Sequence, residues 1–290
     1  MRAGAVLLAL LALAGCATGG GRVGVVSGGT TRSYMLVAPP AADDAPRPLV
    51  IALHGWLGSP EQMARMSGLS AAAARYGFVV AYPRGEWHAW AMEPASRRGA
   101  ADAAFLAQVV AEVSAVVPIA PSRIYAVGFS SGGFMAQALA CSGRVRLAGL
   151  AVVASGLPVP AATGCVPGTG VPFLLIQGSA DPIVPMRGID TQDRRILPTW
   201  DTLGFWAARN QCQGLDHAAG AGIRRTIGRA CRDGDTEAWI IDGAGHGWPG
   251  SSFAYPAFLA GPRATTPDAT SILLDFLLRQ RAGPNPVRVR

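Results

Sequence analysis

Six short, almost wholly apolar runs are the feature of this sequence that most constrains its fold. Each is four to eight residues long, and none alternates regularly with polar residues. Runs of this kind are typical of strands that are buried on both faces of a sheet. They occupy residues 49–53, 78–82, 124–129, 147–154, 173–176 and 238–241.

Segments with helical character lie between these runs. The first begins after Ser59, a good N-cap residue, and ends at Gly77. Strands that alternate with helices predict an α/β fold with a mainly parallel central sheet and helices on both faces. A strand at 32–39, paired with one at 23–27, is expected ahead of this series. The predicted helices span residues 60–76, 99–117, 134–140, 203–210 and 267–281.

Composition limits the classes of protein to which the chain can belong. Half of its 290 residues are apolar and 15% are charged, which excludes a disordered polyelectrolyte. The net charge is +7, but the arginines are scattered, so we expect no nucleic-acid partner. One catalytic domain is predicted over residues 32–282, followed by a C-terminal tail at 283–290.

The N-terminus has the pattern of an export signal. Arg2 precedes an apolar run at 3–14 that is too short to span a membrane comfortably. The run ends in Leu-Ala-Gly-Cys at 13–16, which resembles the bacterial lipobox. We therefore predict a lipoprotein signal peptide at 1–15, lipidation of Cys16, and a tether with an N-terminal strand at 16–31. The protein is expected to be exported and membrane-anchored on the periplasmic or cell-surface side, or to be extracellular.

Four further cysteines suit an oxidising compartment. Four cysteines permit three pairings. We predict Cys212–Cys231, which closes a short turn-rich segment, and Cys141–Cys165, which ties the helix predicted at 134–140 to the loop after the next strand. The sequence has four histidines and no CxxC pair, so we expect neither a metal site nor a cofactor.

A candidate nucleophile follows the third apolar run. Residues 128–133 read Gly-Phe-Ser-Ser-Gly-Gly, which matches the G-x-S-x-G pattern between a strand and a helix. Such a turn presents Ser130 at a helix N-terminus, where backbone N–H groups face the reacting atoms. The alternative interpretation is an ordinary glycine-rich turn of an α/β protein.

A serine nucleophile needs a base and an acid that orients the base. His246 lies in a glycine-rich loop after the last apolar run, and Asp181 follows the run at 173–176. The order Ser, Asp, His is that of the α/β-hydrolase fold. Taken singly, Asp181 suits an Asp-Pro turn and His246 suits a loop histidine, but together with Ser130 they predict a catalytic triad.

Two backbone N–H groups are expected to stabilise the oxyanion. One belongs to Ser131, the residue after the nucleophile. The other belongs to Trp56, in the His-Gly-Trp-Leu-Gly segment at 54–58 that follows the first apolar run. His54 is predicted to position this loop or bind substrate rather than to transfer protons.

Taken together, these segments resemble the extracellular polyhydroxybutyrate depolymerase and feruloyl/acetylxylan esterase group of the α/β-hydrolase superfamily, the carbohydrate esterase family-one type. The resemblance runs from about residue 32 to 249. It rests on residues 54–55, 82–83, 128–133, 180–185 and 245–250, on Asp102, and on Trp206 ahead of Cys212 and Cys231. The family often has cysteine at the position of Trp56 and an acidic pair at 101–102.

The resemblance implies a secreted serine ester hydrolase acting on short, aromatic or hydroxyalkanoate esters. Trp248, Trp87 and Trp90 are candidate substrate-binding residues, because aromatic rings near the site can hold an aryl or sugar group. The expected partner is a small or oligomeric ester. Two alternatives stay open, a serine peptidase of the prolyl-oligopeptidase type and a non-catalytic lipoprotein binding module.

Overall fold

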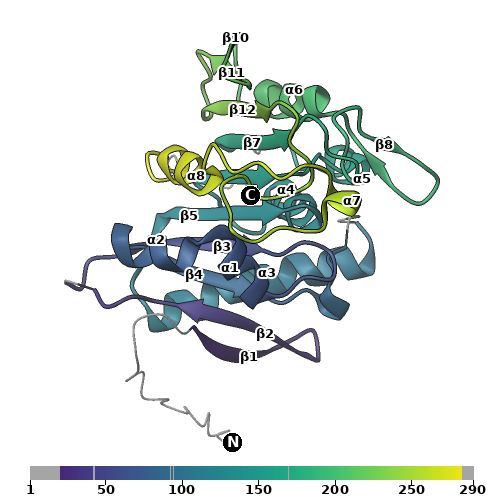
Figure 1. Ribbon diagram of the computed structural model, residues 1–290. Coiled ribbons are helices and arrows are strands. Elements are labelled where there is room, and N and C mark those ends of the chain that lie inside the picture. The colour runs from purple at the N-terminus through teal and green to yellow at the C-terminus, as the bar shows by residue number, and fades with distance from the viewer. Residues whose placement is uncertain (1–19, 42, 92, 94, 169, 283–290) are drawn as a thin grey trace, which may run out of the picture.

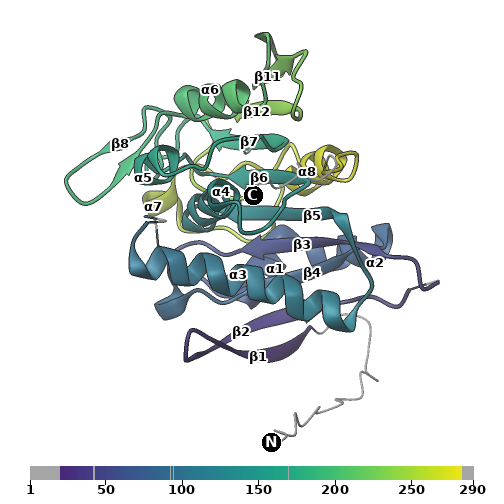
Figure 2. The same ribbon diagram turned by 180° about the vertical axis from the view of Figure 1, so that it is seen from behind.

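A ten-stranded, mostly parallel sheet with helices on both faces forms the centre of the protein (Figures 1 and 2). The computed structural model describes residues 20–41, 43–91, 93, 95–168 and 170–282. The strand order is β1-β2-β4-β3-β5-β6-β7-β12-β11-β10. This architecture confirms the predicted α/β-hydrolase fold class.

The six apolar runs form the six parallel strands. β4, β3, β5, β6, β7 and β12 pair in parallel register, so their carboxyl ends meet at one edge of the sheet. Nearly every residue of these strands is buried, which is why their sequences show no alternation. Their bounds are Arg47–Leu53 (β3), Val79–Pro83 (β4), Ile119–Phe129 (β5), Gly149–Val153 (β6), Phe173–Gly178 (β7) and Thr236–Ile241 (β12).

Antiparallel hairpins extend the sheet at both ends. β1 (Gly21–Ser27) pairs with β2 (Thr30–Val37), and β2 continues onto β4. The sheet therefore begins at Gly21, and the expected domain start at residue 32 falls inside β2. At the other end, β10 (Gly214–Gly220) and β11 (Ile223–Arg229) form a hairpin that the sequence did not predict.

The helices divide into two layers. α1 (Pro60–Ser67), α2 (Leu69–Tyr76) and α8 (Ala269–Leu277) cover the face seen in Figure 1. α3 (Arg97–Val116), α4 (Ser131–Ser142), α5 (Val159–Thr163) and α6 (Thr199–Arg209) cover the face seen in Figure 2. The single helix predicted at 60–76 is divided at Gly68, whose φ of 64° ends α1 in the left-handed conformation. Helices α6 and α8 match the predicted segments with shifted ends.

One helix of the described part, α3, is long and apolar enough by composition to cross a membrane. It lies along the sheet, with Phe105, Leu106 and Val109 buried in the core. The smaller elements are a 3-10 turn at Glu86–His88, the hairpin of β8 (Ile189–Asp190) and β9 (Arg195–Ile196), and α7 (Ala257–Ala260). The 3-10 turn follows the carboxyl end of β4, and the other three elements follow those of β7 and β12.

Candidate active site

Ser130 occupies a sharp turn between β5 and α4. Its backbone has φ 53° and ψ −122°, a conformation that L-residues rarely adopt. Hydrogen bonds hold the turn on both sides, from Ser130 N–H to Val153 O (2.9 Å) and from Gly133 N–H to Ser130 O (2.8 Å). This is the strained strand-to-helix geometry of a nucleophile elbow, which presents the hydroxyl at the edge of the sheet.

Two glycines make this turn possible. A Cβ atom at Gly128 would overlap the backbone of Gly132 and Gly133, and a Cβ atom at Gly132 would overlap the carbonyl oxygen of Leu53. The start of α4 therefore packs directly against the end of β3. This close approach brings the N–H of Ser131 beside the loop that follows β3.

Asp181 and His246 come together from the ends of β7 and β12. His246 Nδ1 donates to Asp181 Oδ2 at 2.8 Å, and both side chains are buried. Asp181 Oδ2 also accepts from Gln177 Nε2 at 3.1 Å, while its Oδ1 accepts the N–H groups of Ile183 and Val184 at 2.8 Å. Four hydrogen bonds thus fix the carboxylate and orient the imidazole. Gln177, which follows a fully apolar strand segment, was not identified from the sequence.

The rings of His246 and Phe129, the residue before the nucleophile, lie 5.1 Å apart. His246 is therefore next to the elbow. Ser130 Oγ and His246 Nε2 have no hydrogen-bond partner within the described part of the chain. Serine–histidine hydrogen bonds are often loose before substrate binds, and both atoms are free to engage it.

The loop after β3 lies beside the nucleophile. A Cβ atom at Gly55 would be 3.0 Å from the ring of Phe129 and 3.5 Å from Ser130 Cβ. Gly58 N–H donates to Gly55 O at 3.0 Å, so residues 55–58 form a turn with Trp56 and Leu57 at its centre. The N–H groups of Trp56 and Ser131 have no acceptor among the described residues. They are the two groups expected to bind an oxyanion.

The ring of His54 connects this loop to the loop after β4 through two hydrogen bonds. Its Nδ1–H donates to Gly55 O (2.7 Å), and its Nε2 accepts Gly85 N–H (3.0 Å), which is possible only for the neutral ring. Burial lowers the pKa of His54 to about 4. Both ring nitrogens are hydrogen-bonded to the backbone, so His54 has no free ring nitrogen for substrate or for proton transfer, as expected for a residue that positions the loop.

Of the three tryptophans proposed to bind substrate, only Trp87 is free, with 81% of its surface exposed. Trp90 is 4% exposed and donates through Nε1 to His54 O. Trp248 is 3% exposed and donates to Thr270 Oγ1 on α8. This corrects the expectation for Trp90, whose ring is buried against the loop at 54–58 and offers almost no surface to a substrate. Trp248 is also mostly buried, but it lines a narrow pocket with His246, and its part in substrate binding stays a prediction.

Two aromatic residues that the sequence reasoning missed also line the pocket beside the base. Phe253 and Tyr255 line a narrow pocket with His246, and their rings meet edge-on at 5.2 Å. Tyr255 stacks on Phe129 at 6.1 Å, and its hydroxyl accepts from Gln62 Nε2. The signal was present as Phe-x-Tyr shortly after the histidine loop.

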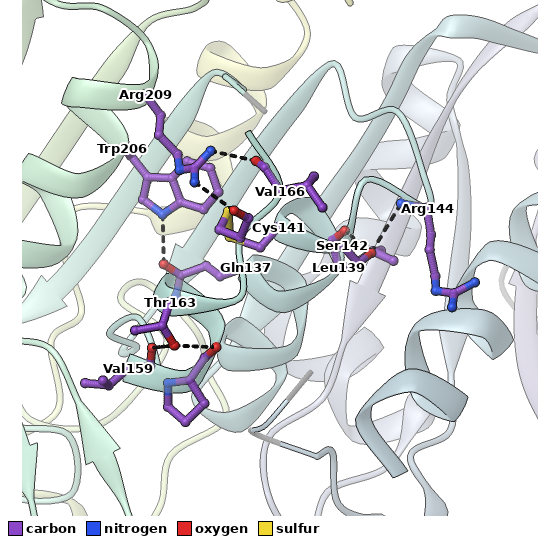
Figure 3. The surroundings of a disulfide bond; sticks show 12 residues. Gln137, Leu139, Cys141, Ser142, Arg144, Val159, Thr163, Val166, Trp206 and Arg209 are labelled. Atoms are coloured by element: carbon purple, nitrogen blue, oxygen red, sulfur yellow. Dashed lines mark hydrogen bonds between the residues drawn. A yellow bond between two sulfur atoms is a disulfide. The ribbon is translucent and has the colours of Figure 1, made fainter. Parts of the chain in front are cut away.

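The back of α4 is fastened to its neighbours (Figure 3). The Cys141–Cys165 disulfide ties its last turn to the loop after α5. Gln137 accepts from Trp206 Nε1 at 3.0 Å. It also donates to Gly156 O at 2.7 Å. Arg209 donates to the carbonyls of Cys165 and Val166. These contacts, of which those of Gln137 are buried, keep the helix behind Ser130 in one position.

The second disulfide, Cys212–Cys231, closes the base of the β10–β11 hairpin, and both pairings are those expected from the sequence. Residues 1–19, which include Cys16 and the expected signal peptide, lie outside the described residues. Within the described ranges no three His, Cys, Asp or Glu side chains are grouped as metal ligands.

Comparison with known proteins places this chain among esterases. The family model "Esterase PHB depolymerase" matches residues 32–184. The esterase named NocK of Nocardia uniformis subsp. tsuyamanensis is 36% identical over 281 residues, covering 88% of this chain and 81% of that protein. Feruloyl esterase B of Piromyces equi is 28% identical over 217 residues, covering 70% of this chain but only 40% of that enzyme.

Among solved structures, an acetyl xylan esterase from Aspergillus awamori superimposes with a TM-score of 0.62. The superposition covers 79% of this chain and 94% of the acetyl xylan esterase. At 16% sequence identity it is evidence for the fold alone. The family model spans more than half of the chain and includes the nucleophile turn and Asp181. The chain therefore belongs to the esterase PHB depolymerase family and is an ester hydrolase of the α/β-hydrolase fold.

Proposed function

We propose that the chain hydrolyses carboxylic esters through an acyl-enzyme, with Ser130 as nucleophile, His246 as base and Asp181 as the orienting acid. The observation that carries this proposal is the strained elbow at Ser130 beside a buried His246–Asp181 pair. Asp181 holds the proton on Nδ1 of His246, which leaves Nε2 as the acceptor for the serine proton.

The reaction proceeds in two steps. Ser130 Oγ attacks the ester carbonyl as His246 Nε2 takes its proton, and the N–H groups of Trp56 and Ser131 stabilise the oxyanion. The tetrahedral intermediate collapses, the C–O bond to the alcohol breaks, and His246 protonates the leaving alcohol. Water then enters and attacks the acyl carbon as His246 takes its proton. The bond between the acyl carbon and Ser130 Oγ breaks, His246 returns the proton to Oγ, and the acid is released.

We infer that the substrates are short, aromatic or hydroxyalkanoate esters. Trp56 and Trp87, exposed by 68% and 81%, stand on adjacent loops, and Phe253 and Tyr255 line the pocket at His246. Aromatic rings on the loops around a catalytic site suit an aryl ring, a sugar or an apolar acid unit. The family description and the name of the Piromyces equi relative, a feruloyl esterase, support the same classes of substrate.

We further propose export and anchoring through a lipid at Cys16, with residues 1–15 removed as a signal peptide. One catalytic domain would follow, joined to the anchor just before β1. The apolar leader at 3–14 and the two disulfides support this proposal. Mass spectrometry of the native protein tests it, and an unmodified Cys16 in the membrane fraction would contradict the anchor.

A substrate panel tests the function. The purified wild type and Ser130→Ala are assayed on methyl ferulate, short and long p-nitrophenyl esters, and hydroxybutyrate oligomers. We expect the long-chain ester to be the poorest substrate and Ser130→Ala to lose about three orders of magnitude in kcat. Preference for the long-chain ester would contradict the substrate class, and an active Ser130→Ala enzyme would contradict the mechanism. Exposed Ser252 provides a matched Ser252→Ala control.

A further inference from the structure

The turn that carries the proposed oxyanion donor is conformationally costly. Leu57 has φ 57°, a left-handed value that is unfavourable for a leucine. The hydrogen bond from Gly58 N–H to Gly55 O closes the turn. Among the described residues no hydrogen bond is made by Trp56 N–H itself, so none fixes its direction. Contacts from outside the turn must hold that conformation.

His88 supplies two such contacts on the outer side of the turn. Its Nδ1–H donates to Gly58 O at 2.8 Å, and its own carbonyl accepts Leu57 N–H at 2.8 Å. These two hydrogen bonds fix the N–H group of Leu57 and the carbonyl group of Gly58, which flank the left-handed residue on either side. His88 itself has φ 58° and follows Trp87 at φ 55°, so two consecutive residues adopt a costly backbone conformation to make these bonds.

We propose that His88 is a positioning residue of the oxyanion hole, acting through its Nδ1–H bond to Gly58 O to hold Trp56 N–H in place. This inference rests on the proposed function. His54 binds the first carbonyl group of the turn, that of Gly55, and His88 binds the last, that of Gly58. Since an oxyanion donor contributes most in the transition state, loss of the hydrogen bond from His88 to Gly58 should lower kcat more than it changes KM.

Two variants of the same shape isolate the donor. Asn and Asp both tolerate left-handed backbone, and their outer atoms stand as far along the side chain as Nδ1 of histidine. His88→Asn keeps an N–H for Gly58 O, whereas His88→Asp places a carboxylate against that carbonyl. His88→Gly, which fits the backbone but has no side chain, serves if the Asp variant does not fold.

The measurements are kcat and KM on p-nitrophenyl acetate, the inhibition constant of phenylboronic acid as a tetrahedral analogue, and Tm. We expect His88→Asp and His88→Gly to lose about tenfold in kcat relative to His88→Asn, with KM within about twofold and a parallel loss of boronate affinity. Recovery in the Asn variant is an effect that a merely structural role would not produce.

Equal kcat values in the Asn, Asp and Gly variants would overturn the inference while leaving the proposed function intact, provided that Ser130→Ala is inactive in the same assay. A loss that appears only in KM or only in Tm would overturn it as well. An active Ser130→Ala enzyme would overturn the proposed function and this inference with it.

Discussion

Replacing Asp181 with asparagine separates the charge of the carboxylate from its shape. An amide can present its oxygen to the N–H groups of Ile183 and Val184, as Asp181 Oδ1 does. Its NH₂ group then faces two donors, Gln177 Nε2 and His246 Nδ1–H. His246 can relieve this conflict by moving its proton to Nε2, and in that tautomer it cannot accept the proton of Ser130.

The structure therefore predicts a large kinetic effect and a moderate loss of stability. We expect kcat to fall by about 10³ to 10⁴, as for a base held in the wrong tautomer. The hydrogen bond from Gln177 is lost and the other three no longer involve a charged carboxylate, which should lower the free energy of unfolding by about 3 kcal/mol. The assays are hydrolysis of p-nitrophenyl acetate and urea denaturation followed by circular dichroism.

Asp190 provides the matched control. It also carries one negative charge, but it is exposed on the β8–β9 hairpin and pairs with Arg195, which is exposed as well. Asp190→Asn should leave kcat unchanged and stability within about 0.5 kcal/mol of wild type. The reasoning fails if Asp181→Asn retains more than about a tenth of the wild-type kcat while the protein remains folded.

Three further predictions follow from the loop and the hairpin. Gly132→Ala should lower kcat at least about tenfold and reduce Tm, because the methyl group meets the backbone of Leu53; an unchanged rate would refute the close approach. The pKa of His54 in the folded protein is about 4, below its usual 6.5, so between these pH values the unfolded state binds a proton that the folded state does not. The free energy of unfolding should therefore drop by about 3 kcal/mol between pH 6.5 and pH 4. The drop should be smaller in His54→Gln, which has no imidazole to protonate. The double variant Cys212→Ser/Cys231→Ser should lose about 2–4 kcal/mol of stability with kcat unchanged; a fall in kcat would link the hairpin to the active site.

The parallel core was predictable because burial on both faces leaves a direct record in the sequence. The β10–β11 hairpin leaves none, because its strands read GLDHAAG and IRRTIGR and most of their side chains are not buried. β11 is held by pairing with β12, and β10 by pairing with β11. The break at Gly68 depends on a left-handed turn that interrupts an otherwise continuous helical pattern.

The candidate site shows the same division. Ser130, Asp181 and His246 could be proposed because each follows a recognisable strand in a known chain order. The direction of a side chain could not be predicted, which is why Trp90 was expected to meet substrate although it lies buried. The hydrogen bond from His88 to Gly58 joins residues thirty positions apart, and no local sequence pattern indicates it.

The central claim is that Ser130 is the nucleophile of an ester hydrolase. Reaction with a fluorophosphonate, followed by peptide mapping, tests it directly. The account predicts one adduct per chain, located on Ser130, with esterase activity lost in proportion to labelling. Full activity in a completely labelled sample, or an adduct on another residue that accounts for the inactivation, would contradict it.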